Sequence, residues 1–197
     1  MKKFIIPFLT VFLLLMIDGF IAARNQEPYI YQNENKFQIP NFQAKDLNGN
    51  TVTNDIFEGK FTVVCLWVIK DATDSQKLMA DIENLKTSTS LNFRLIGIIG
   101  DMKEDSDGLR FEIARDVAKN FPNIPQIIPN DEMTDILSKI RNAPTVFFVN
   151  GEGKIIGQPV VGNENILIKK ELFRLMNKNS EYEKMRKKSD INIFFTF

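Results

Sequence analysis

The residues of this chain that could do chemistry are few, because the sequence holds one cysteine, Cys65, and no histidine. A single cysteine cannot form a disulfide within the chain, and without histidine the commonest general base and the commonest zinc ligand are both missing. Cys65 lies in the middle of an apolar run, where buried cysteine behaves as a small apolar residue. We therefore expect Cys65 in the core; the alternative is a one-cysteine enzyme that uses it as the nucleophile.

Two carboxylates three residues apart, Asp71 and Asp74, stand where an apolar run gives way to a helical pattern. The dipole and the free N–H groups of a helix N-terminus favour negative charge at this place. In one interpretation both residues are ordinary capping or first-turn acids, worth about 1 kcal/mol or less each. In the other, Asp71 belongs to a surface that binds a partner.

These residues are positioned by the stretch Phe61–Leu85, which predicts a strand, a tight turn and a helix. Phe61–Ile69 is almost continuously apolar, as is typical of a strand covered on both faces. Thr73 and Gln76 have the spacing of a capping box, ahead of apolar residues that repeat at helical period: Leu78, Met79, Ile82 and Leu85. Phe93–Gly100 is a second buried strand, so the unit is expected to be βαβ with parallel strands.

Further elements are predicted on both sides of this unit. The N-terminal side has an edge strand over Phe37–Phe42 and a hairpin turn at Asn48-Gly49. The C-terminal side has the following segments: a helix over Leu109–Phe121 packing through Leu109, Ile113, Val117 and Ala118, an irregular connection over Phe121–Pro129, a helix over Met133–Ile140 opened by Asn130 and Asp131, a hairpin over Ala143–Gly157, and a closing helix over Ile166–Met176. The fold class indicated is α/β.

Composition and the two ends of the sequence indicate the domain organisation and the class of partner. The 197 residues, 44% of them hydrophobic, suffice for one well-buried domain, and the net charge of zero gives no indication of a nucleic-acid partner. Residues 1–23 have a basic start and an apolar run, which predicts a signal peptide or a membrane anchor, with a plain helix as the third possibility. We expect a linker over 24–36, the folded domain over 37–176, and a charged tail with an apolar end over 177–197.

Metal and cofactor sites are not indicated. The acidic stretch with Asp101, Glu104, Asp105 and Asp107 offers oxygen ligands of the kind calcium takes, but its spacing fits no EF-hand loop, and a solvated loop is the preferred interpretation. We expect no metal and no cofactor.

Several motifs resemble a known family when taken together. They are PNFQAKDLNGNTV, GKFTVVCLWV and NAPTVFFVNGEGKIIG, which follow one another behind the apolar N-terminal segment. Over about residues 37–176 the chain resembles the TlpA/ResA-type redoxins of the thioredoxin superfamily. The resemblance implies a thioredoxin-like fold with a central mixed β-sheet flanked by helices and an N-terminal hairpin extension. It also implies a cis peptide bond before Pro144 and matches Trp67 to the tryptophan that ends the central strand.

The departure from the family lies at the active site. The resemblance places the two family cysteines on Asp71 and Asp74, which keep the charge of a reactive thiolate but cannot attack a disulfide. The function expected is therefore an extracytoplasmic, secreted or membrane-anchored protein that has lost dithiol activity and acts as a binding or scaffold module, with a polypeptide as its partner. The binding face implied by the family comprises Trp67, Asp71, Asp74, Asn142 and Pro144. The alternative is a thiol-disulfide oxidoreductase that works through Cys65 or a partner's thiols.

Overall fold

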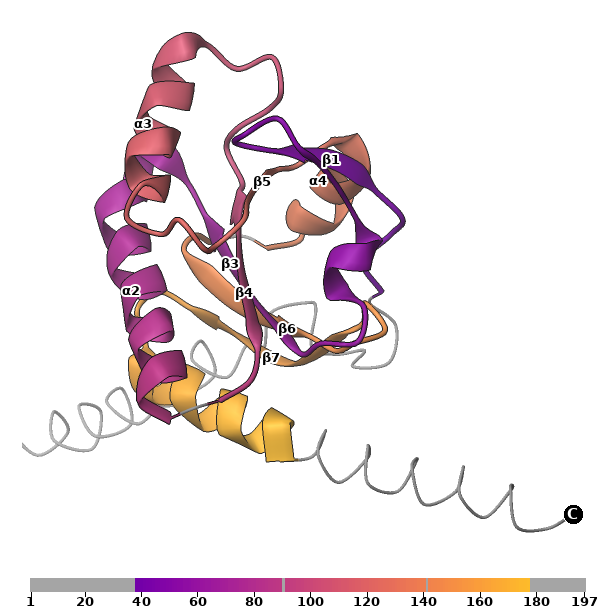
Figure 1. Ribbon diagram of the computed structural model, residues 1–197, viewed down its shortest axis with the longest axis vertical. Helices are drawn as coiled ribbons and strands as arrows, with labels where there is room; N and C mark the ends of the chain where they lie inside the picture. The colour runs from indigo at the N-terminus through magenta and orange to yellow at the C-terminus, as the bar shows by residue number, and fades with distance from the viewer. Residues whose placement is uncertain (1–37, 90, 141, 178–197) are drawn as a thin grey trace, which may run out of the picture. The chain divides into compact units, whose positions relative to one another are not determined.

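A computed structural model describes residues 38–177 apart from residues 90 and 141. In this part of the chain one mixed sheet has the strand order β2-β1-β5-β4-β3-β6-β7 (Figure 1). The strands are β1 Gln43–Asp46, β2 Thr51–Thr53, β3 Thr62–Trp67, β4 Arg94–Ile99, β5 Gln126–Ile128, β6 Thr145–Val149 and β7 Ile155–Val161. The helices are α2 Ala72–Thr89, α3 Gly108–Ala118, α4 Asp131–Leu137 and a final helix over residues 165–177, with short 3-10 helices η2 Asn54–Phe57 and η3 Ile69–Asp71. The predicted α/β class and mixed sheet are confirmed.

The expected segments at 1–23, 24–36 and 178–197 lie outside the described residues. Within residues 38–177, no helix is long and apolar enough to span a membrane.

The centre of the sheet is the predicted βαβ unit. β3 runs parallel to β4 from Thr62 opposite Arg94 to Trp67 opposite Ile99, and α2 connects the two strands. β6 pairs with the other side of β3 in antiparallel orientation. Every residue of β3 is buried, which explains its continuous apolar sequence, because side chains alternate between two covered faces.

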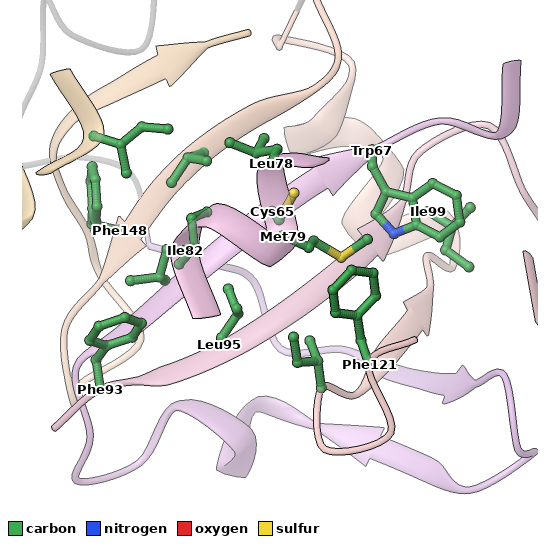
Figure 2. Close-up of a cluster of buried hydrophobic side chains, with 14 of the residues drawn as sticks. Cys65, Trp67, Leu78, Met79, Ile82, Phe93, Leu95, Ile99, Phe121 and Phe148 are labelled. Atoms are coloured by element: carbon green, nitrogen blue, oxygen red, sulfur yellow. The ribbon is translucent and has the colours of Figure 1, made fainter. Parts of the chain in front are cut away.

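Each face of the sheet has its own core. On one face Val63, Cys65 and Trp67 of β3 pack with side chains of α2, α3 and the final helix, as Figure 2 shows around α2. On the other face Val64 and Leu66 pack with residues of η2, α4 and the N-terminal segment. The sheet therefore has helices on both sides, and the carboxyl ends of β3 and β4 open at one edge of the layers.

The N-terminal hairpin is confirmed, whereas the edge strand expected before it is not formed. Gly49 adopts φ +83° in the β1–β2 turn, and the Asp46 carboxylate accepts the backbone N–H groups of Asn48 and Asn50. Within residues 38–42, the part of the expected strand that the structure describes, the pairing is limited to an isolated bridge between Gln38 and Lys154. The reason is that Asn54 takes over the backbone groups a ladder would use, accepting the N–H of residue 42 and donating to the carbonyl of residue 40.

Two other local expectations were wrong, and a third was right only in part. α2 begins at Ala72 directly after η3, so Thr73 lies inside the helix and not at its cap. The connection expected to be irregular contains β5, which pairs with both β1 and β4. In α3 the expected face is right in part: Val117 is buried and Ala118 packs against the core, whereas Leu109 is 65% exposed. Ala114 and Phe111 also contact the core, so the buried face is rotated from the one expected.

Candidate functional site

The turn between β3 and α2 carries Asp71 and is fixed by neighbouring hydrogen bonds. The N–H of Ile69 donates to Oδ1 of Asp101, which follows β4, at 2.9 Å. The N–H of Asp71 donates to the carbonyl of Val68 at 3.2 Å and closes the 3-10 turn. Ser75, fully buried in α2, donates its hydroxyl to the carbonyl of Asp71 at 2.9 Å. Asp71 is therefore held directly before α2 by both its backbone groups.

The loop before β6 approaches this turn from the other side. The Ala143–Pro144 peptide bond is cis, the isomer that the family resemblance implies, and Pro144 is buried. The carbonyl of Asn142 accepts the hydroxyl of Thr145 at 2.6 Å, and the carbonyl of Pro144 accepts the N–H of Gly162 at 2.8 Å. These bonds use the backbone carbonyls and leave the Asn142 side chain exposed at the surface.

Between the turn and this loop lies an open hollow of about 540 Å³. Its walls come from the ends of β3 and β4, from α4 and from the loop before β6: Leu66, Val68, Lys70, Asp71, Gly100, Pro129, Thr134, Leu137, Ser138, Ile140, Asn142 and Ala143. Its lining mixes apolar side chains such as Leu66 and Ile140 with charged and polar ones such as Lys70 and Asp71. The hollow lies outside the carboxyl ends of parallel strands, the usual position of ligand sites in open α/β sheets.

The structure brings some of the expected site residues together and separates others. Asp71 and Asn142 both line the hollow, and Pro144 follows the lining residue Ala143. Asp74 is exposed in the first turn of α2, as expected of a first-turn acid, and is not among the lining residues. The α2 dipole favours a carboxylate at both aspartate positions.

Trp67 lies beneath the site and not in it. Its side chain is fully buried, and its indole N–H donates to Oε1 of Gln126 in β5 at 2.9 Å. Figure 2 shows Trp67 in the cluster around Cys65. Its contact with the site is indirect, through the backbone of β3, which leads into the turn that carries Asp71.

Cys65 occupies the middle of β3, opposite Gly97 of β4 and Val146 of β6. Its side chain has no exposed surface, and Figure 2 shows it beneath Leu78 and Met79 of α2. Burial raises the pKa of the Cys65 thiol to about 12 because the thiolate would lose its hydration. At neutral pH the group is therefore a protonated thiol without access to a substrate, as expected of a core residue.

Two carboxylates of the acidic loop after β4, those of Asp101 and Asp107, form hydrogen bonds within the fold. Asp101 accepts the Ile69 N–H and lies 3.7 Å from the Arg110 guanidinium, which also donates to the Asp101 carbonyl. Asp107 caps α3 by accepting the Arg110 N–H at 2.9 Å, while Glu104 and Asp105 are exposed. Among the described residues, no three side chains of the metal-binding types histidine, cysteine, aspartate and glutamate lie close enough together to hold an ion.

Sequence reasoning missed the far wall of the hollow. Leu137 and Ile140 of the α4 region, together with Pro129 after β5, were not proposed as site residues. The helix over 133–140 was expected, but nothing in its pattern indicated which end of the sheet it would cover. The predicted βαβ unit could have indicated this region, because ligands of open α/β sheets bind beyond the carboxyl ends of the parallel strands.

Comparison with known proteins supports the fold. No protein-family profile and no curated protein sequence matches the chain. Among solved structures, the chain is similar to the thioredoxin domain of a thiol-disulfide oxidoreductase from Bacteroides vulgatus, with a TM-score of 0.51, 20% identity, and coverage of 70% of this chain and 95% of the other. It is also similar to yeast Sco1, with a TM-score of 0.54, 15% identity, and coverage of 72% and 98%.

A third similar structure is a SCO1/SenC family lipoprotein from Bacillus anthracis, with a TM-score of 0.54, 14% identity, and coverage of 72% of this chain and 96% of the other. All three likenesses lie below 25% identity and establish the thioredoxin-like fold alone. The chain thus has a thioredoxin-like fold, and its strand-to-helix junction carries two aspartates.

Proposed function

We propose that this chain is an extracytoplasmic redoxin of the TlpA/ResA type that has lost dithiol redox activity and binds extended polypeptide. The proposal is supported by the different positions of the carboxylates and of the thiol in the fold. The junction where the resemblance expects two cysteines holds Asp71 and Asp74, while the only cysteine of the sequence is sealed in the core. The scaffold of a redox site is kept without a nucleophile.

The proposed binding face is centred on the hollow between Asp71 and Asn142. A lining that combines apolar and polar groups suits an extended polypeptide, because apolar residues can contact its side chains while polar groups such as Asp71 and Asn142 can bond to its backbone. Pro144 shapes the loop that borders the hollow, Asp74 adds negative charge in the first turn of α2, and Trp67 supports the turn from the core. Because binding at such a face needs no thiol, it survives the exchange of both cysteines.

A location outside the cytoplasm is part of the proposal. It is supported by the basic and apolar pattern of residues 1–23 and by the likeness of the fold to a protein described as a lipoprotein. The competing function, a thiol-disulfide oxidoreductase working through Cys65, requires this side chain to leave the core.

The test uses a permanently unfolded polypeptide, fluorescently labelled carboxymethylated α-lactalbumin, and the full chain. We expect saturable binding that Asp71→Lys weakens about tenfold, because the substitution reverses a charge in the lining of the hollow. The matched control is Asp116→Lys, which makes the same charge change on the exposed side of α3. Equal affinities of the two variants, or no binding by the unmodified protein, would contradict the proposed face.

A further inference from the structure

A second open hollow lies between the C-terminal half of α2 and the start of the final helix. It measures about 560 Å³ and is lined by Asp81, Ile82, Asn84, Leu85, Thr87, Ser88, Asn165, Ile168 and Lys169. Ile82 and Ile168 form its buried floor, Leu85 is half-buried, and short polar side chains stand at its rim. Asn165 donates its amide to the Asp81 carboxylate at 2.7 Å and ties the two helices together at one end.

This groove, defined by those lining residues and called the α2 groove below, has the apolar side chains Ile82, Leu85 and Ile168 in its lining. Ile166 and Leu167, which follow Asn165, are 82% and 50% exposed. Neither of them lines the groove, so the helix beside it carries further apolar surface that is open to contact with another segment or molecule.

The sequence of the same chain supplies a segment of matching character. Residues 191–197 read INIFFTF, with three phenylalanines and two isoleucines, and they lie outside the described residues. We propose that the apolar segment Ile191–Phe197 docks in the α2 groove of its own chain. This inference is independent of the function proposed above.

The length of the connection permits this contact. The segment is joined to the final helix by the thirteen residues 178–190, which reach at most about 45 Å when extended. The return from residue 177 to Ile168, along a helix that itself forms one wall of the groove, is only about 14 Å. A tether of this length gives an effective concentration in the millimolar range, so even weak apolar contacts are populated within one chain before a partner competes.

The test is a disulfide between the groove and the segment. Ser88→Cys at the rim is combined with Thr196→Cys in the full chain, and oxidation by copper-phenanthroline is followed by mass spectrometry. The native thiol does not interfere, because Cys65 is fully buried. The matched control combines Thr196→Cys with Asn48→Cys, an exposed position in the β1–β2 turn at the other edge of the sheet.

We expect the Ser88→Cys pair to form the intrachain disulfide at least about tenfold faster than the Asn48→Cys pair. Both pairs share the same tether, but docking raises the concentration of the Thr196→Cys thiol near residue 88 alone. Adding Phe194→Asp and Phe195→Asp should reduce the rate to that of the control, because the apolar contacts are lost. Equal rates in the two pairs would overturn the proposal. So would a product linked between two chains, which indicates a second copy in the groove.

Discussion

Trp67 and Gln126 are joined by a buried hydrogen bond between side chains 59 residues apart in the sequence. The indole N–H meets Oε1 of the amide at 2.9 Å, and the amide nitrogen donates to the Ile124 carbonyl at 3.2 Å. Gln126 stands opposite Gly97 in the β4–β5 ladder, where a Cβ atom at residue 97 would lie 2.0 Å from the same Oε1. One polar pair, with room made for it by a glycine, thus fixes the end of β3 beneath the candidate site.

Replacing Gln126 by leucine tests this pair. The substitution leaves the indole N–H of Trp67 buried without an acceptor, so we expect the free energy of unfolding to fall by about 1–3 kcal/mol. Urea denaturation followed by circular dichroism measures it. In a double-mutant cycle with Trp67→Phe, the two losses should be less than additive; full additivity would mean that the two side chains do not interact.

Gly97→Ala tests whether the side-chain amide of Gln126 needs the space left by the absence of a Cβ atom at Gly97. The added methyl group overlaps Gln126, which is held by its own hydrogen bonds, so we expect a loss of about 1–3 kcal/mol in the free energy of unfolding. Gly108→Ala is the matched control, because a Cβ atom at that position meets nothing within 4 Å. Urea midpoints of the two variants should differ clearly, and equal midpoints would contradict the contact.

The acid stability of the protein should depend on Glu171 in the final helix. Burial raises the pKa of this carboxyl, but hydrogen bonds from Arg174 and from the Gln158 N–H at the edge strand β7 outweigh that effect, so the pKa lies below its ordinary value. A group with a lowered pKa stabilises the fold above its unfolded-state pKa, and this contribution disappears as the pH falls through the folded-state pKa.

Glu171→Gln should therefore lower the free energy of unfolding at neutral pH by about 1 kcal/mol or less. The difference between the variant and the unmodified protein should shrink as the pH falls below roughly 4. Urea denaturation at a series of pH values between 3 and 7 checks this, taking the range from the ordinary glutamate pKa of about 4.3. A difference that grows on acidification would show that the sign is wrong.

Restoring cysteines at residues 71 and 74 tests the assignment of the junction. Asp71→Cys with Asp74→Cys should create a reactive dithiol, because the first turn of α2 stabilises a thiolate, and the variant should reduce insulin where the unmodified protein does not. The Asp71→Ser and Asp74→Ser variant is the control without thiols. If the cysteine variant folds and stays inert, these residues are not the equivalents of the family cysteines.

The sequence was most informative where one physical requirement dominated. The continuous apolar run of β3 could only be a strand buried on both faces, and this placed Cys65 in the core and Asp71 at the turn. The thioredoxin-like resemblance placed Pro144 opposite that turn. β5 was missed because its three residues, Gln126–Ile128, lie between Pro125 and Pro129, and only pairing with β1 and β4 makes them a strand.

Other details depend on contacts between distant parts of the chain. Thr73 and Gln76 had the right spacing for a cap, but the 3-10 turn held by Asp101 starts the helix earlier. The edge strand expected before residue 43 is replaced by hydrogen bonds to Asn54. Likewise, the far wall of the hollow depends on how α4 packs over the sheet, which no local pattern specifies.

The central claim, a redoxin scaffold without an available thiol, is tested most directly by the reactivity of Cys65. The rate of its reaction with 5,5′-dithiobis(2-nitrobenzoic acid) at pH 7 is compared between the native protein and the protein in denaturant. Because the side chain is fully buried and burial raises its pKa to about 12, we predict no reaction in the native state beyond the rate of unfolding, and full reaction of one thiol after denaturation. Rapid modification of the folded protein at neutral pH would contradict the account and favour a one-cysteine enzyme.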